Sequence, residues 1–266
     1  MKIMCIGDIS GRPGRETVAK LLPQIKANEG IDFVIANCEN AAGGYGITRQ
    51  ILDELSGYGI DFFTSGDHVW KISDFLNDLQ DLRLPLVRPY NYEQEEQIPG
   101  KGYEVIDMGS EKLVIINMLG QVFMHEFVRN PFWSIDTLLE KLKEDGVKET
   151  DAIVIDFHAE ATAEKISFAY YLAERVSAVV GTHTHVPTAD ARIIGRAAFV
   201  SDLGMVGPLD ASLWAGFDEV IHNFKYPFKK AKQMQTQGRR VFNSVVIEII
   251  KGKAVSINRL DRTISA

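Results

Sequence analysis

The feature that most constrains the fold is a short apolar run that ends in polar residues and is followed by a segment with helical periodicity. Residues 3–6 form the first such run, and the pattern recurs at residues 33–36, 61–64, 152–157 and 178–180. Continuous apolar runs that alternate with amphipathic helices are typical of parallel strands in an α/β protein, because such strands are buried on both faces. The periodicity predicts helices near residues 15–27, 49–58, 73–82, 135–144 and 163–173.

The middle of the chain differs, because residues 103–108 and 112–117 are typical of two hairpin strands joined at Gly109-Ser110. Further strands are expected at residues 197–200, 242–250 and 254–260. The sequence contains no linker rich in Pro or Ser, no low-complexity segment and no obvious repeat. We therefore expect a single domain over residues 1–266, with two packed sheets.

The charge and the cysteine content of the chain limit the kinds of molecule and compartment with which it is compatible. Lys and Arg number 29 against 36 Asp and Glu, which gives a formal net charge of −7. This acidity argues against broad binding to nucleic-acid backbones or anionic lipid, so an anionic substrate needs a local positive charge. Cys5 and Cys38 are too few for a disulfide scaffold, and no apolar run approaches the roughly 20 residues of a membrane span. We expect a cytoplasmic protein with reduced thiols and no membrane association.

Residues with metal-binding side chains follow the predicted strands. In open parallel sheets, ligands bind at the carboxyl ends of the strands, where the loops converge. The candidate site residues at these ends are Asp8, Glu39, Asn40, Asp67, His68, His158, His183 and His185. This mixture of nitrogen and oxygen donors suits borderline divalent metals. Asp8 or Asn40 alone is better explained as a turn or helix-cap residue than as a ligand, but capping and turns do not explain the whole set.

Spacing adds detail to this prediction. If the segment after residue 180 is extended, His183 and His185 point to the same face and address one site, and His158 enters from the neighbouring strand. A carboxylate can bridge two ions, and Glu39 or Asp8 is the natural candidate. Two ions about 3.5–4 Å apart can clamp a phosphate and activate a water molecule.

The same residues lie in motifs that resemble the YmdB-like family of calcineurin-type metallophosphoesterases. The motifs are Gly7-Asp8 and residues 38–43, 66–68, 156–162 and 181–186, together with 86–89 and 202–205. The resemblance implies an α/β fold that is a four-layer α/β/β/α sandwich of the metallophosphoesterase type, with two mixed sheets flanked by helices. It also implies a dinuclear metal centre and phosphodiesterase activity that includes 2′,3′-cyclic nucleotides.

The resemblance assigns a role to each candidate residue. Asp8 and His185 would bind the first ion, Glu39 would bridge to the second, and Asn40, Asp67, His158 and His183 would complete the second site. A metal-bound hydroxide would attack the phosphorus, and His68 would donate a proton to the leaving group. The cofactors are expected to be two divalent or mixed-valence ions, iron first, with manganese and zinc open.

One position departs from the family pattern. The family has Asn in its Gly-Asn-His motif, whereas this chain has Asp67 between Gly66 and His68. The additional negative charge is expected to tighten metal binding. It should also weaken the attraction for phosphate or shift the apparent pKa of the metal-bound water upward.

The expected partner is a small phosphodiester or cyclic nucleotide, with RNA ends as a related substrate and a homo-oligomer of undetermined order. An alternative is a regulatory nucleotide-binding protein that uses the metal centre with little or no turnover. A purely structural metal site is disfavoured, because structural zinc sites are closed by four ligands.

Weaker signals leave alternatives open. Residues 41–46 could offer backbone N–H groups to phosphate or form a flexible turn. Arg88 could contact phosphate or form a surface ion pair, and His125 and His222 are expected to be surface or structural residues. The basic stretch 225–232 could contact RNA, but a solvated face with buried aromatic residues is the preferred interpretation.

Overall fold

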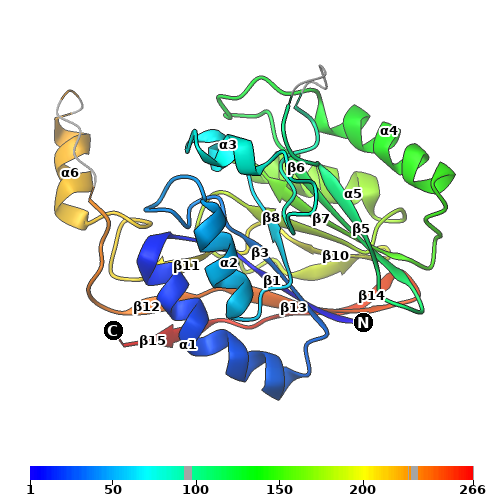
Figure 1. The fold of residues 1–266 in the computed structure, drawn as a ribbon, viewed down its shortest axis with the longest axis horizontal. Helices are drawn as coiled ribbons and strands as arrows, with labels where there is room; N and C mark the ends of the chain where they lie inside the picture. Colours follow the sequence, from blue (N-terminus) through cyan, green and yellow to red (C-terminus); the bar gives the residue numbers. More distant parts are fainter. Residues whose placement is uncertain (93–97, 227, 229–232, 266) are drawn as a thin grey trace.

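The computed structural model describes residues 1–92, 98–226, 228 and 233–265 (Figure 1). It has a mixed α/β fold, as the sequence predicted. The first sheet has the strand order β14-β13-β1-β3-β4. Its strands are Lys253–Arg259, Ser244–Ile250, Lys2–Ile6, Phe33–Asn37 and Phe62–Thr64 in that order. The pairings of β1 with β3 and of β3 with β4 are parallel, whereas β13 is antiparallel to both of its neighbours.

The second sheet has the order β5-β6-β7-β8-β10-β9. Its strands are Tyr103–Asp107, Lys112–Leu119, Ala152–His158, Ala178–Thr182, Ala197–Val200 and Arg192–Ile194. The inner strands β6, β7, β8 and β10 are parallel, and the two edge strands are antiparallel to them. The predicted hairpin of β5 and β6 is therefore confirmed.

A third sheet was not expected from the sequence. It has the order β15-β12-β11-β2, formed by Arg262–Ile264, Arg240–Phe242, Met205–Pro208 and Asp8–Ile9. The prediction of one strand at residues 242–250 was wrong, because the chain changes sheet at Asn243 between β12 and β13. Gly7 marks the corresponding change between β1 and β2. Its N–H donates to the Asn243 carbonyl, and a side chain at Gly7 would clash with the Gly204 carbonyl.

Seven helical segments accompany the described strands. They are α1 (Gly11–Glu29), α2 (Arg49–Gly57), the 3₁₀ turn η1 (Asp67–Trp70), α3 (Phe75–Asp78), α4 (Pro131–Glu144), α5 (Thr162–Leu172) and α6 (Phe217–Lys225). The helix expected at residues 73–82 is reduced to α3. Gln80 and Asp81 donate their N–H groups to carbonyls three residues earlier, so the chain continues as turns, which Asn and Asp favour.

Burial of apolar residues alternates along the strands. In β7, Val154 joins a cluster that contains residues of both large sheets, such as Cys5 of β1. Ile155 belongs to a cluster with Leu138 of α4 and Phe168 of α5. A third cluster joins α1 and α2 to the first sheet. The buried faces therefore fix the register of the strands and the position of their carboxyl ends.

The parallel strands deliver their last residues to neighbouring positions. Leu119, His158 and Thr182 are register partners across β6, β7 and β8, and Asn37 pairs with Thr64 across β3 and β4. Each of these residues ends its strand, so the segments that follow start side by side. Among the helices of the described residues, none has the length and apolarity needed to cross a bilayer.

Candidate metal centre

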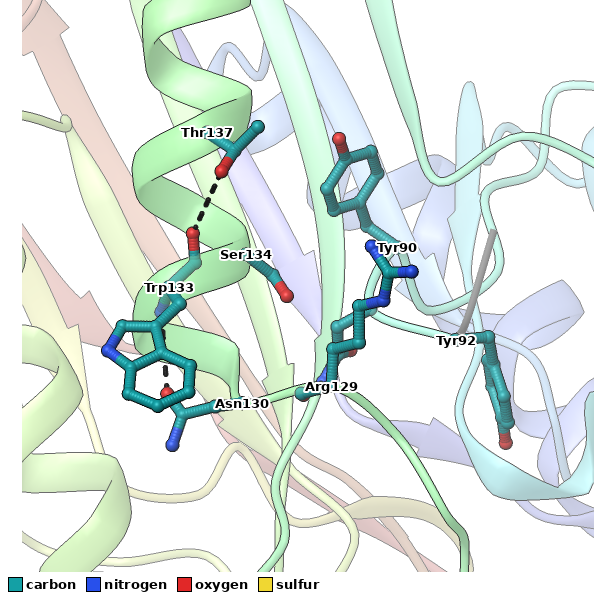
Figure 2. A pocket seen from close by; sticks show the side chains of 8 residues that line it. Tyr90, Tyr92, Arg129, Asn130, Trp133, Ser134 and Thr137 are labelled. Carbon is teal, nitrogen blue, oxygen red and sulfur yellow. Dashed lines mark hydrogen bonds between the residues drawn. The ribbon is translucent and has the colours of Figure 1, made fainter. Parts of the chain in front are cut away.

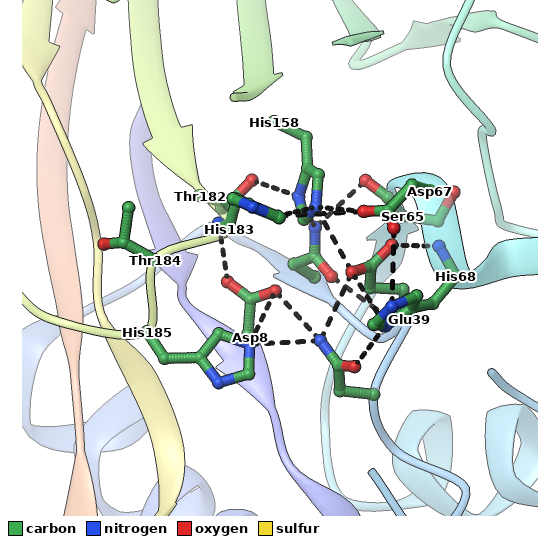
Figure 3. Close-up of polar contacts among 12 residues, drawn as sticks. Asp8, Glu39, Ser65, Asp67, His68, His158, Thr182, His183, Thr184 and His185 are labelled. Carbon is green, nitrogen blue, oxygen red and sulfur yellow. Dashed lines mark hydrogen bonds and ion pairs between the residues drawn. The ribbon is translucent and has the colours of Figure 1, made fainter. Parts of the chain in front are cut away.

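All eight candidate residues meet in one cluster at these strand ends (Figure 3). They are connected by hydrogen bonds or ion pairs between Asp8, Glu39, Asn40, Asp67, His68, His158, His183 and His185. Asp8 begins β2, His158 ends β7, and Asp67 and His68 begin η1. The other residues lie in the turns after β3 and β8. Residues far apart in the sequence are thus brought to one point.

One group of donors surrounds His158. Its Nε2 atom lies 3.2 Å from Asp67 Oδ1 and 3.1 Å from His183 Nδ1. The donor atoms of Asp67, His158 and His183 all lie within 4.8 Å of one another, close enough for the three side chains to hold one ion. His183 also extends outward, because its Nε2 atom lies 3.2 Å from Glu160 Oε2.

A second group overlaps with the first. Asp8, Glu39 and His158 also place donor atoms within 4.8 Å of one another, and all three are buried. His185 Nε2 lies 3.6 Å from Asp8 Oδ1 and 3.1 Å from Asn40 Nδ2. The amide nitrogen of Asn40 thus faces Asp8 and His185, whereas its oxygen faces His68.

His68 lies at the more open side of the cluster. Its side chain is 23% exposed, and its Nε2 atom lies 3.3 Å from Asp67 Oδ2. Nδ1 lies 2.9 Å from Asn40 Oδ1, and the backbone N–H donates to Glu39 Oε2 at 2.9 Å. The ring of Tyr45 contacts the imidazole edge-on, with 4.9 Å between ring centroids. These contacts fix the ring while leaving part of it accessible.

The backbone around His183 and His185 is not extended, so that part of the prediction was wrong. β8 ends at Thr182, and φ is +101° at His183 and +65° at His185. Positive φ is unfavourable for residues other than glycine. The turn is held by hydrogen bonds from the N–H of His183 to Asp8 and from that of Thr184 to Asp202. Both imidazoles nevertheless reach the cluster.

Charges in the cluster compensate one another only in part. Burial raises the pKa of Asp8 and of Asp67, but neighbouring histidines outweigh burial and hold both values well below the ordinary range. Burial lowers the pKa of His158, yet the carboxylates, Glu39 first, raise it well above its usual value. The pKa of His183 falls to about 4, because of burial and the charge on His158. Asp8 and Asp67 are therefore ionised, and Glu39 places a third carboxyl group beside them.

The donor set fits metal ions. Histidine and carboxylate donors in this number suit iron, manganese or zinc. Within the described part of the chain, no Lys or Arg forms an ion pair with Asp8, Glu39 or Asp67. A side chain at Gly66 would clash with both Glu39 and His158, so glycine keeps the space beside these donors open. The carboxylates are paired only with histidines, and neutral histidines together with carboxylates are the groups that bind a metal ion.

Asp156 positions His158 through the Thr182 hydroxyl, a role that was not predicted from the sequence. Its Oδ1 atom accepts a hydrogen bond of 2.6 Å from the Thr182 hydroxyl, and the Thr64 hydroxyl donates to Oδ2. Thr182 Oγ1 also lies 2.9 Å from His158 Nδ1. If the Thr182 hydroxyl donates to Asp156, its oxygen accepts a hydrogen bond from His158 Nδ1–H. The Nε2 atom of His158 is then free to bind a metal. The available signal was spacing, because Asp156 lies two residues before His158 on the same face of β7.

A buried ion pair holds the turn that carries His183 and His185. Lys165 of α5 donates to Asp202 Oδ2 and to the Thr182 carbonyl, both at 2.8 Å. Each side chain of the pair is only 1% exposed. Asp202 in turn accepts from the N–H of Thr184 at 3.1 Å. The signal that sequence reasoning missed was a lysine on the apolar face of α5.

The weaker signals had mixed outcomes. Arg88 is 6% exposed and donates to the Pro89 carbonyl, and it has no ion pair among the described residues, so a surface ion pair is excluded there. In the segment 41–46, the N–H groups of Ala42 and Gly44 bond within the turn. His125 is exposed in a loop, and His222 lies in α6, as surface residues.

The expectation of buried aromatic residues in the stretch 225–232 was wrong where it can be checked. Residues 227 and 229–232 lie outside the described residues. Phe224, Tyr226 and Phe228 are exposed.

Comparisons with known proteins identify the family and the relatives of this chain. The sequence model of a family described as YmdB-like protein matches residues 4–260. The chain is 39% identical to the 2′,3′-cyclic-nucleotide 2′-phosphodiesterase of Bacillus subtilis (strain 168), over 98% of this chain and 96% of that protein.

Two solved structures are also similar. A protein from Thermus thermophilus, described as hypothetical, has a TM-score of 0.89 and 33% identity, with 99% of each chain covered. A structure described as a novel phosphatase from Mycoplasma pneumoniae has a TM-score of 0.91 and 29% identity, with 99% of this chain and 93% of that one covered.

Proposed function

The chain belongs to the YmdB-like protein family, and we propose that it is a metal-dependent hydrolase of phosphoric diesters. Its substrates are 2′,3′-cyclic nucleotides and related RNA ends. The observation that carries the proposal is the cluster of three carboxyl groups and four histidines with which no Lys or Arg forms an ion pair within the described residues. The name of the Bacillus relative supports the substrate class.

Two ions complete the site in this proposal. Asp67, His158 and His183 would hold one ion, and Asp8 and His185 would hold the other, with Glu39 available to both. Asn40 supplies an amide oxygen. When bound, such ions act as Lewis acids that polarise a phosphoryl oxygen. They also give the acidic site the positive charge that a phosphodiester requires.

The protein groups orient the reaction. His68 carries a proton at Nε2 and delivers it to the departing oxygen, while its Nδ1–H donates to Asn40 Oδ1 and prevents rotation of the ring. Asp156 and Thr182 fix the His158 tautomer. Gly66 keeps room beside Glu39 and His158. Because these polar groups are already oriented, they do not have to reorient during the reaction.

The proposal also includes the four-layer sandwich and a single domain over residues 1–266. The three apolar clusters support it, because one is shared by the two large sheets and the other two join each sheet to helices.

The test uses metal-depleted protein reloaded with iron, manganese or zinc. Hydrolysis of cyclic nucleotides and aryl phosphodiesters should return with the metal. His68→Ala should keep its metal content and lose turnover at least about 100-fold, because general acid catalysis contributes factors of this size. Tyr170→Ala, an exposed aromatic on α5, serves as the control. Fully loaded protein that is inactive on every phosphoester would refute the proposal, and retained nucleotide binding would then favour a regulatory role.

Asp67 offers a second test, since its carboxylate replaces a neutral amide. Asp67→Asn should release metal more readily, because the variant loses one negative charge beside His158 and His183. The measurement is the dissociation constant of the metal in competition with a chelator, with kcat and its pH profile as further readouts. Unchanged affinity, activity and pH profile together would show that this charge has no effect.

A further inference from the structure

A cavity of about 420 Å³ is lined by none of the candidate metal-centre residues (Figure 2). It lies between the start of α4 and the segments 90–92 and 129–130. Its volume is within the range of small-molecule sites in proteins. The residues that define its chemistry are Tyr90, Tyr92, Arg129, Trp133 and Ser134.

Two contacts tie the cavity to the metal centre. The ring of Tyr92 packs edge-on against Trp70 at 5.2 Å, and Trp70 ends the η1 turn that begins with Asp67. Burial raises the pKa of the Tyr92 hydroxyl, and the carboxylates of Asp67 and Glu39 are among the groups that raise it further. The Tyr92–Trp70 contact therefore links this wall of the cavity to the η1 turn that carries Asp67.

The other wall is anchored to the strand beside His158. The Asn91 amide donates to the carbonyls of Leu119 and Arg129, and its oxygen accepts from the Leu119 N–H at 2.9 Å. Leu119 ends β6 and is the register partner of His158. Asn91, which lines the cavity, is therefore bonded to the strand that pairs with the one ending at His158.

The lining combines a stacking surface with a cation. Trp133 is 76% exposed, although tryptophan usually buries most of its surface. Figure 2 shows its indole on one side of the cavity and Arg129 on the other, with the Ser134 side chain drawn between them. The Arg129 guanidinium is exposed and has no ion pair among the described residues. These groups can together bind a nucleotide, because an indole stacks on a base, a guanidinium binds a phosphate and a hydroxyl bonds to a sugar.

We propose that this cavity binds the nucleotide unit next to the reacting phosphodiester. The inference rests on the proposed function, and it names the substrate class as short RNA ends in preference to single cyclic nucleotides. The base stacks on Trp133, and Arg129 binds the phosphate that links this nucleotide to the reacting one. The formal net charge of −7 argues against a long nucleic-acid footprint, so the proposal requires only one additional nucleotide.

The kinetic test compares a nucleoside 2′,3′-cyclic phosphate with a dinucleotide that carries the same cyclic end. The wild type should have a lower KM for the dinucleotide. Trp133→Ala should reduce kcat/KM for the dinucleotide at least about fivefold, because base–aromatic stacking supplies an effect of this size. The mononucleotide should be unaffected. Tyr170→Ala, an exposed aromatic on a helix outside the cavity, should leave both substrates unchanged.

Arg129 provides an independent variant. Arg129→Ala should raise the KM for the dinucleotide, and Arg129→Lys should restore part of the loss because it keeps the charge. Equal losses on both substrates, or no loss with either Trp133→Ala or Arg129→Ala, would overturn the proposal.

A binding measurement separates this inference from the proposed function. Calorimetric titration of metal-depleted protein with a dinucleoside monophosphate reports on the cavity without turnover. Binding that weakens at least about fivefold in Trp133→Ala supports the cavity even if no hydrolysis is ever observed. Absence of binding by the metal-depleted wild type, or equal binding by Trp133→Ala, refutes it even if the enzyme hydrolyses cyclic nucleotides.

Discussion

Replacing Lys165 by Met tests whether the buried ion pair with Asp202 holds the turn at the metal centre. Both side chains are 1% exposed, so Lys165→Met leaves the Asp202 carboxylate buried without its cation. Two backbone N–H groups, of Thr184 and Gly204, still donate to it. Removing one partner of a buried pair costs about 3–5 kcal/mol, and two remaining donors place this site toward the lower end.

The assay is guanidinium unfolding of metal-depleted protein, so that metal binding does not contribute. Lys143→Met removes an exposed lysine of α4 and should change the free energy of unfolding by less than about 0.5 kcal/mol. Combining Lys165→Met with Asp202→Asn should recover part of the loss, because the amide removes the unpaired charge and keeps an acceptor for Thr184. The double-mutant cycle gives the coupling energy.

Metal affinity gives a second readout for the same variants. Because Asp202 bonds the turn between His183 and His185, Lys165→Met should also weaken metal binding. A destabilisation no larger than that of Lys143→Met, with unchanged metal affinity, would refute the reasoning. In that case the pair would contribute nothing beyond its own burial.

Three further predictions concern pH, thiols and metal. Hydrogen bonds from Ser201 and Thr188 outweigh burial and lower the pKa of Asp190, so its stabilisation is present above its ordinary pKa near 4 and is lost as pH falls through the lowered value. Asp190→Asn should therefore lower the free energy of unfolding by about 0.5–1 kcal/mol at pH 7, allowing for solvent screening, and by less at pH 3. Urea titrations at the two pH values measure this difference, and an equal loss at both would contradict the prediction. Burial raises the pKa of the Cys5 and Cys38 thiols, so mass spectrometry should find neither alkylated by iodoacetamide at pH 8 until the chain unfolds. Metal at 100 times its dissociation constant should raise Tm by roughly 5–10 °C over chelated protein, and no shift by calorimetry would count against the site.

Local pattern was sufficient to predict most of the strands and the place where the candidate residues meet. The predicted runs correspond to β1, β3, β4, β7 and β8. They are apolar because both faces of these strands are buried, so consecutive residues are enough to recognise them. Parallel strands then bring their carboxyl ends to one edge, which explains why residues as distant as Asp8 and His185 could be assigned to one cluster.

The features that the sequence did not predict depend on contacts between distant segments. The break at Asn243 is set by Gly7 and Met205, which pair with its backbone. The partner of Lys165 is fixed only when α5 packs beside β10, because Asp202 follows that strand. The third sheet and the cavity at Trp133 arise in the same way, from elements that are far apart in the sequence.

The conformation of the turn at His183 and His185 depends on contacts with distant segments as well as on the local sequence. A sequence pattern favours extended backbone for a residue triplet after a strand, yet positive φ at two histidines costs about 1–3 kcal/mol each. The Lys165–Asp202 pair and the bond from His183 N–H to Asp8 offset that strain before any ion binds. Metal binding then does not have to order the turn, so metal-free and metal-loaded protein should share its backbone conformation. Amide hydrogen exchange at Thr184 would be equally slow in both forms, and fast exchange in the metal-free form alone would mean that the ions impose the turn.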